Sequence, residues 1–370
     1  MKKGWKVFVW LCVLFFIAGA SLFAFIHFSP EPPVGEIEAA RLALVAARNA
    51  KAETYANKPF ETAQKSYDSA MIAWRTENER FVFNRDFDNV IKLANEAVDN
   101  AIKAEKQAIA ARANLKASLA ESISEINEVL KQLNGGLSRF PAPEAITNNI
   151  AKGRLLFSEG RVAFNAGNYA SAERRILDAY QMLNNAHDRL YRLVDNYFDD
   201  HPQWVRWRNE TIAQSRRERI AVIIVDKWAG KCYVYRNGNR THTFDAELGK
   251  NWIGHKMRRG DHVTPEGRYH VTRMRQGRHT IYHKSLMINY PNADDQKRFR
   301  QNIAQGRIPR NANIGGNIAI HGHGGKGNDW TQGCVALSNN DMDVLFRLVA
   351  VGTPVTIIGS VRSKQEILNQ

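Results

Sequence analysis

Apolar and polar residues follow three successive patterns along the chain. Residues 7–28 form an apolar run without Asp, Glu, Lys or Arg, long enough to cross a bilayer as a helix. Over residues 36–200, apolar residues recur at spacings of three and four, which predicts helices. Over residues 215–361, β-branched runs and alternating segments predict strands. We therefore expect an α+β multidomain chain with a membrane segment (residues 1–30), an all-α domain and a C-terminal β-rich domain.

Interruptions of the helical pattern predict several antiparallel helices. They fall at residues 58–59, 84–86, 134–136, 141–143 and 167–168, where Pro, Gly, Asn and Asp gather. Small and aromatic residues recur with similar spacing in two of the helical segments, which suits helices stacked like a tetratricopeptide solenoid. An ordinary helical bundle explains the spacing equally well. These helices contain no recognisable reactive site.

The β-rich part begins after residues 204–219, a basic, Trp-containing segment that we interpret as a connector. Residues 220–225 are β-branched and residues 231–235 alternate in polarity, so both are predicted strands. Asn237-Gly238 is a turn dipeptide that leads into a further extended stretch at 241–248.

The first residues bear on location. Lys2, Lys3 and Lys6 precede the apolar run and should stay cytoplasmic, which exports everything that follows. The segment Ala18-Gly19-Ala20 resembles a signal-peptide cleavage site, but the apolar run continues to Phe28, which favours an uncleaved anchor. We expect a periplasmic-face envelope protein held in the inner membrane by this helix.

The chain is basic, with 52 Lys and Arg against 37 Asp and Glu and a net charge of +15. Such a surplus favours anionic partners. Export excludes nucleic acid, so acidic lipid headgroups and cell-wall carboxylates are left.

The three cysteines do not make a disulfide framework. Cys12 lies in the apolar run, which leaves Cys232 and Cys334. They could pair with each other, but Cys232 lies on a predicted strand between apolar neighbours and is best interpreted as a packed, inert thiol. The free thiol that calls for a function is Cys334.

The informative stretch is residues 318–337. A short apolar strand ends at His321, a glycine-rich loop follows, and Gly333 precedes Cys334. Thiol acyl transfer needs these parts, because a thiolate attacks a carbonyl while an imidazole takes and returns the proton. Backbone N–H groups beside a glycine can bind the developing oxyanion.

Here the sequence resembles the L,D-transpeptidases, the family with a YkuD-type catalytic domain, over residues 219–360. The resemblance rests on Ile320-His321-Gly322 and on Thr331-Gln332-Gly333-Cys334. Further matching segments, in order, are 248–250, 254–256, 260–261, 264–269, 290–292, 329–331 and 352–355.

The resemblance implies roles for individual residues. Cys334 would be the nucleophile and His321 its base, oriented by a backbone carbonyl rather than a carboxylate. Gly333 and Cys334 would supply N–H groups to the oxyanion hole, with Gly322 and Thr331 shaping the site. No metal and no cofactor are implied.

Four further residues are candidate substrate contacts: His323, Trp330, Tyr290 and Lys256. His323 is also a rival base, and a zinc site on His321, His323 and Cys334 is a further alternative. Their spacing fits no zinc signature, so we favour the metal-free interpretation.

The sequence departs from the family in two ways. Ala336 stands where many members carry Arg or Asn, and His321 lies only thirteen residues before Cys334. The short loop predicts a different lid over the acyl site.

Charged residues cluster before the site. Solvated strand edges explain most of them, but some could attract substrate carboxylates. Asp261, Thr264 and Glu266 are interpreted as turn residues that shape a loop. The cations are Arg258, Arg259, Arg273, Arg275, Arg278 and Lys284.

The resemblance implies a cysteine-dependent L,D-transpeptidase acting on peptidoglycan stem peptides through a thioester on Cys334. It would form cross-links or attach envelope protein. The alternatives are an L,D-carboxypeptidase or peptidoglycan hydrolase using the same thiol, and an envelope scaffold with a vestigial domain. The helical domain could bind an envelope protein partner.

Overall fold

The computed structural model describes residues 2–369, which divide into two compact units. The first runs to Ile123 and includes Ser158–Leu177, and the second contains Ser124–Phe157 and the chain from Asp178 onward. Residues 124–157 and 178–200, which we expected in the helical domain, therefore group with the sheet.

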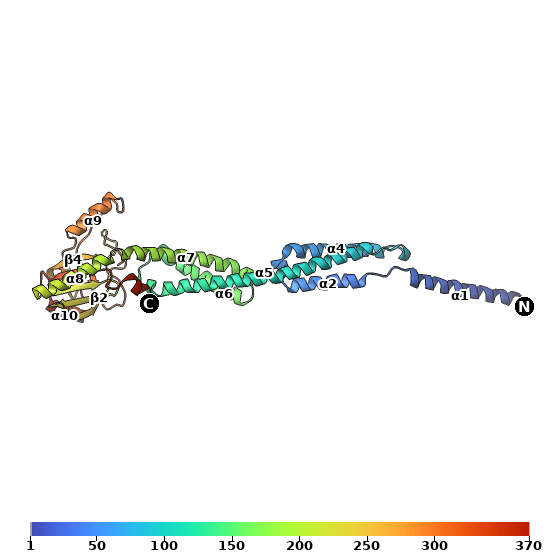
Figure 1. The fold of residues 1–370 in the computed structure, drawn as a ribbon, viewed down its shortest axis with the longest axis horizontal. Coiled ribbons are helices and arrows are strands. Elements are labelled where there is room, and N and C mark those ends of the chain that lie inside the picture. Colours follow the sequence, from blue (N-terminus) through green and yellow to red (C-terminus); the bar gives the residue numbers. More distant parts are fainter. Residues whose placement is uncertain (1, 370) are drawn as a thin grey trace. The chain divides into compact units, whose positions relative to one another are not determined.

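Helices occupy most of the chain before the sheet (Figure 1). The α-helices are α1 (Lys2–Phe28), α2 (Val34–Asn49), α3 (Ala52–Tyr55), α4 (Asn57–Asn78), α5 (Asp88–Asn134), α6 (Glu144–Asn165), α7 (Tyr169–Phe198), α8 (His201–Glu218), α9 (Ala293–Ala304), α10 (Asn339–Leu348) and α11 (Lys364–Leu368). Short 3-10 helices are η1 (Val82–Asn84), η2 (Gly136–Arg139) and η3 (Gly277–His279).

Most of the predicted interruptions coincide with helix ends. The α4–α5, α5–α6 and α6–α7 junctions fall at the expected Pro, Gly, Asn and Asp positions. The α3–α4 junction is at Ala56, so the break predicted at residues 58–59 lies in the first turn of α4. Helix α5 runs uninterrupted for 47 residues, which exceeds a whole tetratricopeptide repeat of about 34 residues. The tetratricopeptide-like arrangement is therefore not confirmed.

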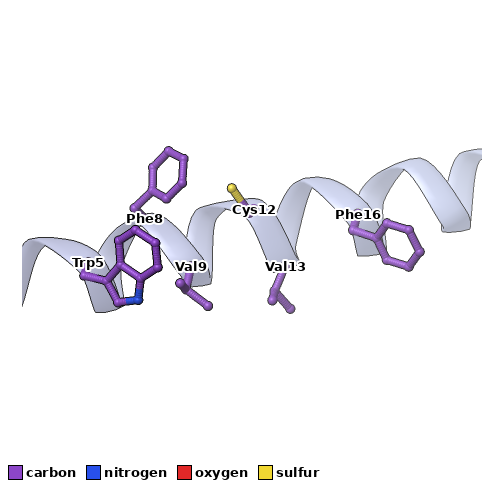
Figure 2. A pocket seen from close by; sticks show the side chains of 6 residues that line it. All are labelled: Trp5, Phe8, Val9, Cys12, Val13 and Phe16. Carbon is purple, nitrogen blue, oxygen red and sulfur yellow. The ribbon is translucent and has the colours of Figure 1, made fainter.

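Helix α1 matches the predicted membrane segment. Gly4–Phe23 has a mean hydropathy of 2.2 with no buried residue, and it is the one helix in the described part of the chain that is long and apolar enough to cross a bilayer. A hollow of about 330 Å³ lies along this helix. Figure 2 shows that its lining side chains come from neighbouring turns of α1 alone: Trp5, Phe8, Val9, Cys12, Val13 and Phe16. Its apolar lining offers no acid–base chemistry.

The first unit packs around alanines of α5. They follow alternating spacings of three and four, which places them on one helix face. Their small side chains let α2 and α4 approach α5 closely, and each is fully buried: Ala94, Ala97, Ala101, Ala104 and Ala108.

The second unit contains an eight-stranded sheet in the order β3-β2-β1-β8-β4-β5-β6-β7. The predicted strands and the Asn237-Gly238 turn appear in it. The strands are β1 (Ala221–Asp226), β2 (Lys231–Arg236), β3 (Asn239–Asp245), β4 (Gly267–Gln276), β5 (Lys284–Ile288), β6 (Ala319–His321), β7 (Val335–Ala336) and β8 (Pro354–Ile358). Strand β1 pairs parallel with β8, and β6 pairs parallel with β7.

Residues 204–218 of the segment that we interpreted as a connector lie in helix α8, which packs on β1, β2 and β8. Trp204 of α8 is fully buried. Its ring lies against Gly359, where an added Cβ would come within 2.3 Å of the indole. Only glycine therefore fits beneath Trp204. Thr211 and Ser215 of α8 are buried as well.

A buried ion pair and its hydrogen bonds join helices α7 and α8 to the sheet. Lys227, directly after β1, places Nζ 2.7 Å from Glu266 Oε1, and both side chains are fully buried. Glu266 also accepts hydrogen bonds from the Tyr197 hydroxyl at 2.7 Å and from Trp204 Nε1 at 3.1 Å. Lys227 donates to the carbonyls of Gly254 and Thr264 as well. Glu266 is therefore a central hydrogen-bond acceptor in the interior, not only a turn residue.

We predict that Glu266→Gln lowers the free energy of unfolding by about 3–5 kcal/mol, because it leaves the Lys227 charge buried without its partner. The measurement is a urea titration of the detergent-solubilised chain followed by tryptophan fluorescence. Glu210→Gln is the matched control, since Glu210 forms an exposed pair with Arg268 at 2.8 Å and should have little effect. If the two substitutions lowered the free energy of unfolding equally, the stabilising role assigned to the buried Lys227–Glu266 pair would be contradicted.

Candidate active site

The turn that carries Cys334 is fixed by its neighbours. Thr331 N–H donates to the Leu248 carbonyl at 3.0 Å, and Thr331 Oγ1 donates to the Cys334 carbonyl at 2.7 Å. Gly333 has φ +123°, and a Cβ there would lie 2.6 Å from the Val263 carbonyl oxygen. Only glycine can therefore occupy the position before the cysteine.

The N–H of Gly333 donates to Thr331 Oγ1 at 3.1 Å. This bond satisfies the N–H inside the turn, so it does not support the role predicted for Gly333 as an oxyanion donor. Thr331 and Gly333 instead act together to shape the turn. Gly322 shapes the site in the same sense, because a Cβ there would meet Asn339 Oδ1 at 2.7 Å.

Cys334 lines a cavity of about 690 Å³. Its Sγ lies 3.8 Å from the Asn317 carbonyl oxygen. The other lining residues are mostly polar: Lys256, Arg259, Gly260, Tyr282, Asn313, Gly315, Gly316, Asn317, Ile318, Trp330, Thr331 and Gln332. The cavity is thus suited to a polar substrate such as a peptide.

His321 ends strand β6, beside the strand that follows Cys334. The parallel pairing sets His321 opposite Ala336, two residues after the cysteine. The His321 side chain is fully buried, and its Nδ1 lies 2.6 Å from the Gly322 carbonyl oxygen. A carbonyl can only accept, so we assign the proton to Nδ1. Nε2 then carries a lone pair, and it has no hydrogen-bond partner in the described structure.

Burial keeps the His321 imidazole and the Cys334 thiol uncharged. It lowers the pKa of His321 to about 4, an effect to which the nearby His323 and Lys326 charges add and which the Gly322 carbonyl opposes. Burial also raises the pKa of the Cys334 thiol, although the Ala319 main chain and the Lys256 charge act in the opposite direction. At neutral pH the structure therefore holds a thiol and a neutral imidazole.

Tyr282 was not predicted from the sequence. Its ring stacks on His321 with a centroid distance of 3.6 Å and an interplanar angle of 13°. Burial and the neighbouring Cys334 raise its pKa. No motif surrounds this residue, and the contact depends on the antiparallel pairing of β5 with β6, so no local signal points to it.

Lys256, a candidate substrate contact, lines the cavity. Its side chain is 3% exposed, and Nζ donates to Asp261 Oδ1 at 2.6 Å. Asp261 also accepts from the backbone N–H groups of Met257, Arg258 and Val263. Asp261 is therefore the predicted loop-shaping residue.

Trp330 also lines the cavity. Its Nε1 donates to Glu247 Oε2 at 2.7 Å, and Lys326 Nζ lies 3.4 Å from its ring centroid. Glu247 accepts from Gly327 N–H as well, and Asp329 accepts from Leu248 N–H. These two carboxylates fasten the glycine-rich loop, a role that the sequence did not reveal for Glu247.

Two predicted substrate contacts lie elsewhere. Tyr290 is buried, its hydroxyl donates to the Ile314 carbonyl at 3.3 Å, and burial raises its pKa. It does not line the cavity, so it is a core residue. His323 follows the end of β6 in a left-handed conformation with φ +68° and is exposed. It too is absent from the cavity lining.

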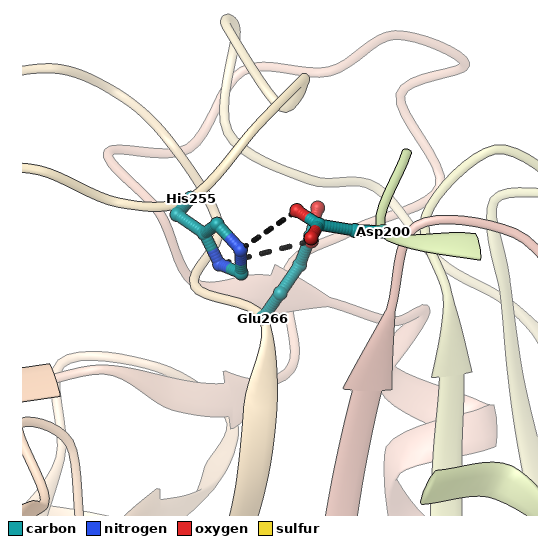
Figure 3. Close-up of side chains that lie close together, drawn as sticks. All are labelled: Asp200, His255 and Glu266. Carbon is teal, nitrogen blue, oxygen red and sulfur yellow. Dashed lines mark hydrogen bonds and ion pairs between the residues drawn. The ribbon is translucent and has the colours of Figure 1, made fainter. Parts of the chain in front are cut away.

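Asp200, His255 and Glu266 form a group whose ligand atoms lie within 4.8 Å of one another. Figure 3 shows His255 facing both carboxylates. His255 Nε2 lies 3.0 Å from Asp200 Oδ2, and its Nδ1 lies 3.8 Å from Glu266 Oε2. Both Glu266 oxygens already accept from donors, including the Lys227 ammonium. A cation would meet that ammonium, so these residues fit a hydrogen-bonded link better than a metal centre.

Comparison with known proteins places the site in a family. Residues 220–357 match the family model described as the L,D-transpeptidase catalytic domain (YkuD). The match confirms the resemblance: the C-terminal half carries a YkuD-type L,D-transpeptidase domain, and it includes Cys334 and His321. No curated protein matches the chain.

Solved structures resemble parts of the chain. Bdellovibrio bacteriovorus Bd1075 is 24% identical over 40% of this chain and 52% of its own, with a TM-score of 0.30. Mycobacterium tuberculosis L,D-transpeptidase 1 is 18% identical over 38% and 62%, with a TM-score of 0.25. The L,D-transpeptidase from Xylanimonas cellulosilytica is 18% identical over 38% and 60%, with a TM-score of 0.26. The match thus spans between half and two thirds of each of these proteins.

We predict that alkylation of Cys334 by iodoacetamide speeds up with pH, with a midpoint above the ordinary thiol value of 9.0, because burial disfavours the thiolate. Peptide mass mapping separates the cysteines. Cys232 is the internal control: it is fully buried, with a pKa of about 12, and should stay unmodified in the folded chain. A midpoint near or below 7 would instead reveal a resting thiolate.

Proposed function

We propose that the chain is a cysteine-dependent L,D-transpeptidase acting on peptidoglycan stem peptides. The observation that carries this proposal is a neutral His321, with Nε2 unpartnered, on the strand beside the one that follows Cys334. The polar cavity and the family match over the same residues support it.

The reaction would proceed through a thioester. Cys334 Sγ attacks the carbonyl at the L-centred third residue of a tetrapeptide stem while His321 Nε2 takes the thiol proton. The tetrahedral oxyanion accepts hydrogen bonds from main-chain donors, among which we assign the Cys334 N–H. The C–N bond breaks, and His321 returns the proton to the departing amine of the terminal D-residue.

An acceptor amine then resolves the thioester. His321 removes a proton from the amine as its nitrogen attacks, and Cys334 leaves as the thiol. The acceptor would be an amine of a neighbouring stem or of an envelope protein. Ala336, which stands where many members carry Arg or Asn, is fully buried, so any substrate contact from this side chain is missing or supplied elsewhere.

The proposed enzyme would work at the membrane. Helix α1 would anchor the chain in the inner membrane and place the sheet on the periplasmic side, with the basic chain near anionic wall and lipid groups. The helices before the sheet would serve as a spacer or as a platform for an envelope protein.

The test incubates the detergent-solubilised full chain with purified tetrapeptide muropeptides and reads the products by mass. Cys334→Ala should abolish cross-linked dimers, and His321→Ala should slow their formation by about 100- to 10,000-fold, the range for a general base. Cys12→Ser is the matched control and should retain activity.

Each outcome assigns a function. Dimers lost in both variants support transpeptidation, whereas shortened monomers alone would identify an L,D-carboxypeptidase. Absence of any product and of any Cys334 adduct from a folded chain would contradict the enzyme and favour the scaffold.

A further inference from the structure

The charged side chains that line the cavity are all positive. Two cations, Lys256 and Arg259, line it, and no Asp or Glu is among its lining residues. Of the six basic residues that cluster in sequence before the site, only Arg259 reaches the cavity wall. A substrate group that lies here meets positive charge alone.

The two cations differ in how far they are neutralised. Lys256 is paired with Asp261 at 2.6 Å and donates to the Arg258 carbonyl. In the described part of the chain, by contrast, no carboxylate forms an ion pair with the Arg259 guanidinium. Arg259 is therefore the cation that remains available to a ligand.

The backbone of Arg259 is held firmly in the wall. Its N–H donates to the Asn313 carbonyl at 2.7 Å, and Asn313 Oδ1 accepts from Gly315 N–H at 2.7 Å. Gly315, with φ +85°, lies against Arg259, whose Cα would be 3.3 Å from an added Cβ. The same segment continues to Asn317, whose carbonyl lies beside Cys334 Sγ. Arg259 and the nucleophile thus share one wall.

We propose that Arg259 binds the free terminal carboxylate of the acyl donor and so restricts the enzyme to peptides that end in a free acid beside the scissile bond. A guanidinium matches a carboxylate through two parallel hydrogen bonds. When the terminal D-residue is held in this way, the carbonyl of the preceding L-centred residue lies at Cys334. This inference rests on the proposed function and names the substrate class of that site.

The test compares two donors: a stem tetrapeptide with a free terminal carboxylate and the same peptide with a terminal amide. Release of the terminal residue is followed with the full chain, Arg259→Gln, Arg259→Lys, and the adjacent exposed Arg258→Gln as matched control. Arg259→Gln should lower kcat/KM for the free acid by about 10- to 100-fold, the usual worth of a charge-assisted pair.

The amide donor should be equally poor with the wild-type chain and with Arg259→Gln. Arg259→Lys should recover part of the rate on the free acid, and Arg258→Gln should match wild type on both donors. An equal loss of activity on both donors, or no loss on the free acid, would overturn the proposal.

A binding measurement separates this proposal from the proposed function. Calorimetry with the Cys334→Ala chain should show the free acid binding about 10-fold or more tightly than the amide, and Arg259→Gln should remove that preference. If the binding preference is present but the wild-type chain forms no acyl-enzyme, carboxylate binding by Arg259 is supported and the proposed transpeptidase function is contradicted. If there is no preference, the carboxylate site is wrong whatever the catalytic result.

Discussion

The ion pair between Lys227 and Glu266 is the constraint on which the arrangement of the sheet-containing unit depends. Both side chains are fully buried, and taking two charges out of water is costly unless their remaining hydrogen-bonding groups are also satisfied. Lys227 meets this requirement with two carbonyls and Glu266 with Tyr197 and Trp204. One pair thereby fixes the end of β1, the loop before β4, and helices α7 and α8.

That loop forms a wall of the cavity. It carries Lys256 and Arg259, and its Val263 carbonyl lies where any side chain at Gly333 would need to be. Full burial of His321 and partial burial of Cys334 keep the imidazole and the thiol neutral at rest. Under the proposed function, the reaction would begin by moving one proton from sulfur to nitrogen, with no resting charge to stabilise.

The sequence predicted what local pattern controls. The helix ends at Pro and Gly and the strands near residues 220–235 could be expected, because each depends on adjacent residues. The roles of His321 and Cys334 came from the family resemblance instead, and they stay proposals. Helix α8 was not predicted, because its buried residues, Trp204, Thr211 and Ser215, lie among polar and basic ones and make no apolar pattern. The roles of Glu266 and Tyr282, and the burial of Tyr290, arise from contacts between distant segments. No local pattern encodes these.

The most direct test of the central claim is the mass of the acyl-enzyme. The full chain is mixed with a stem tetrapeptide, quenched in acid within the first turnovers, and analysed intact and after digestion. We expect an added tripeptide acyl group on the peptide that contains Cys334, removable by hydroxylamine as a thioester is. Product formation without such an adduct, or an adduct on another residue, would contradict it.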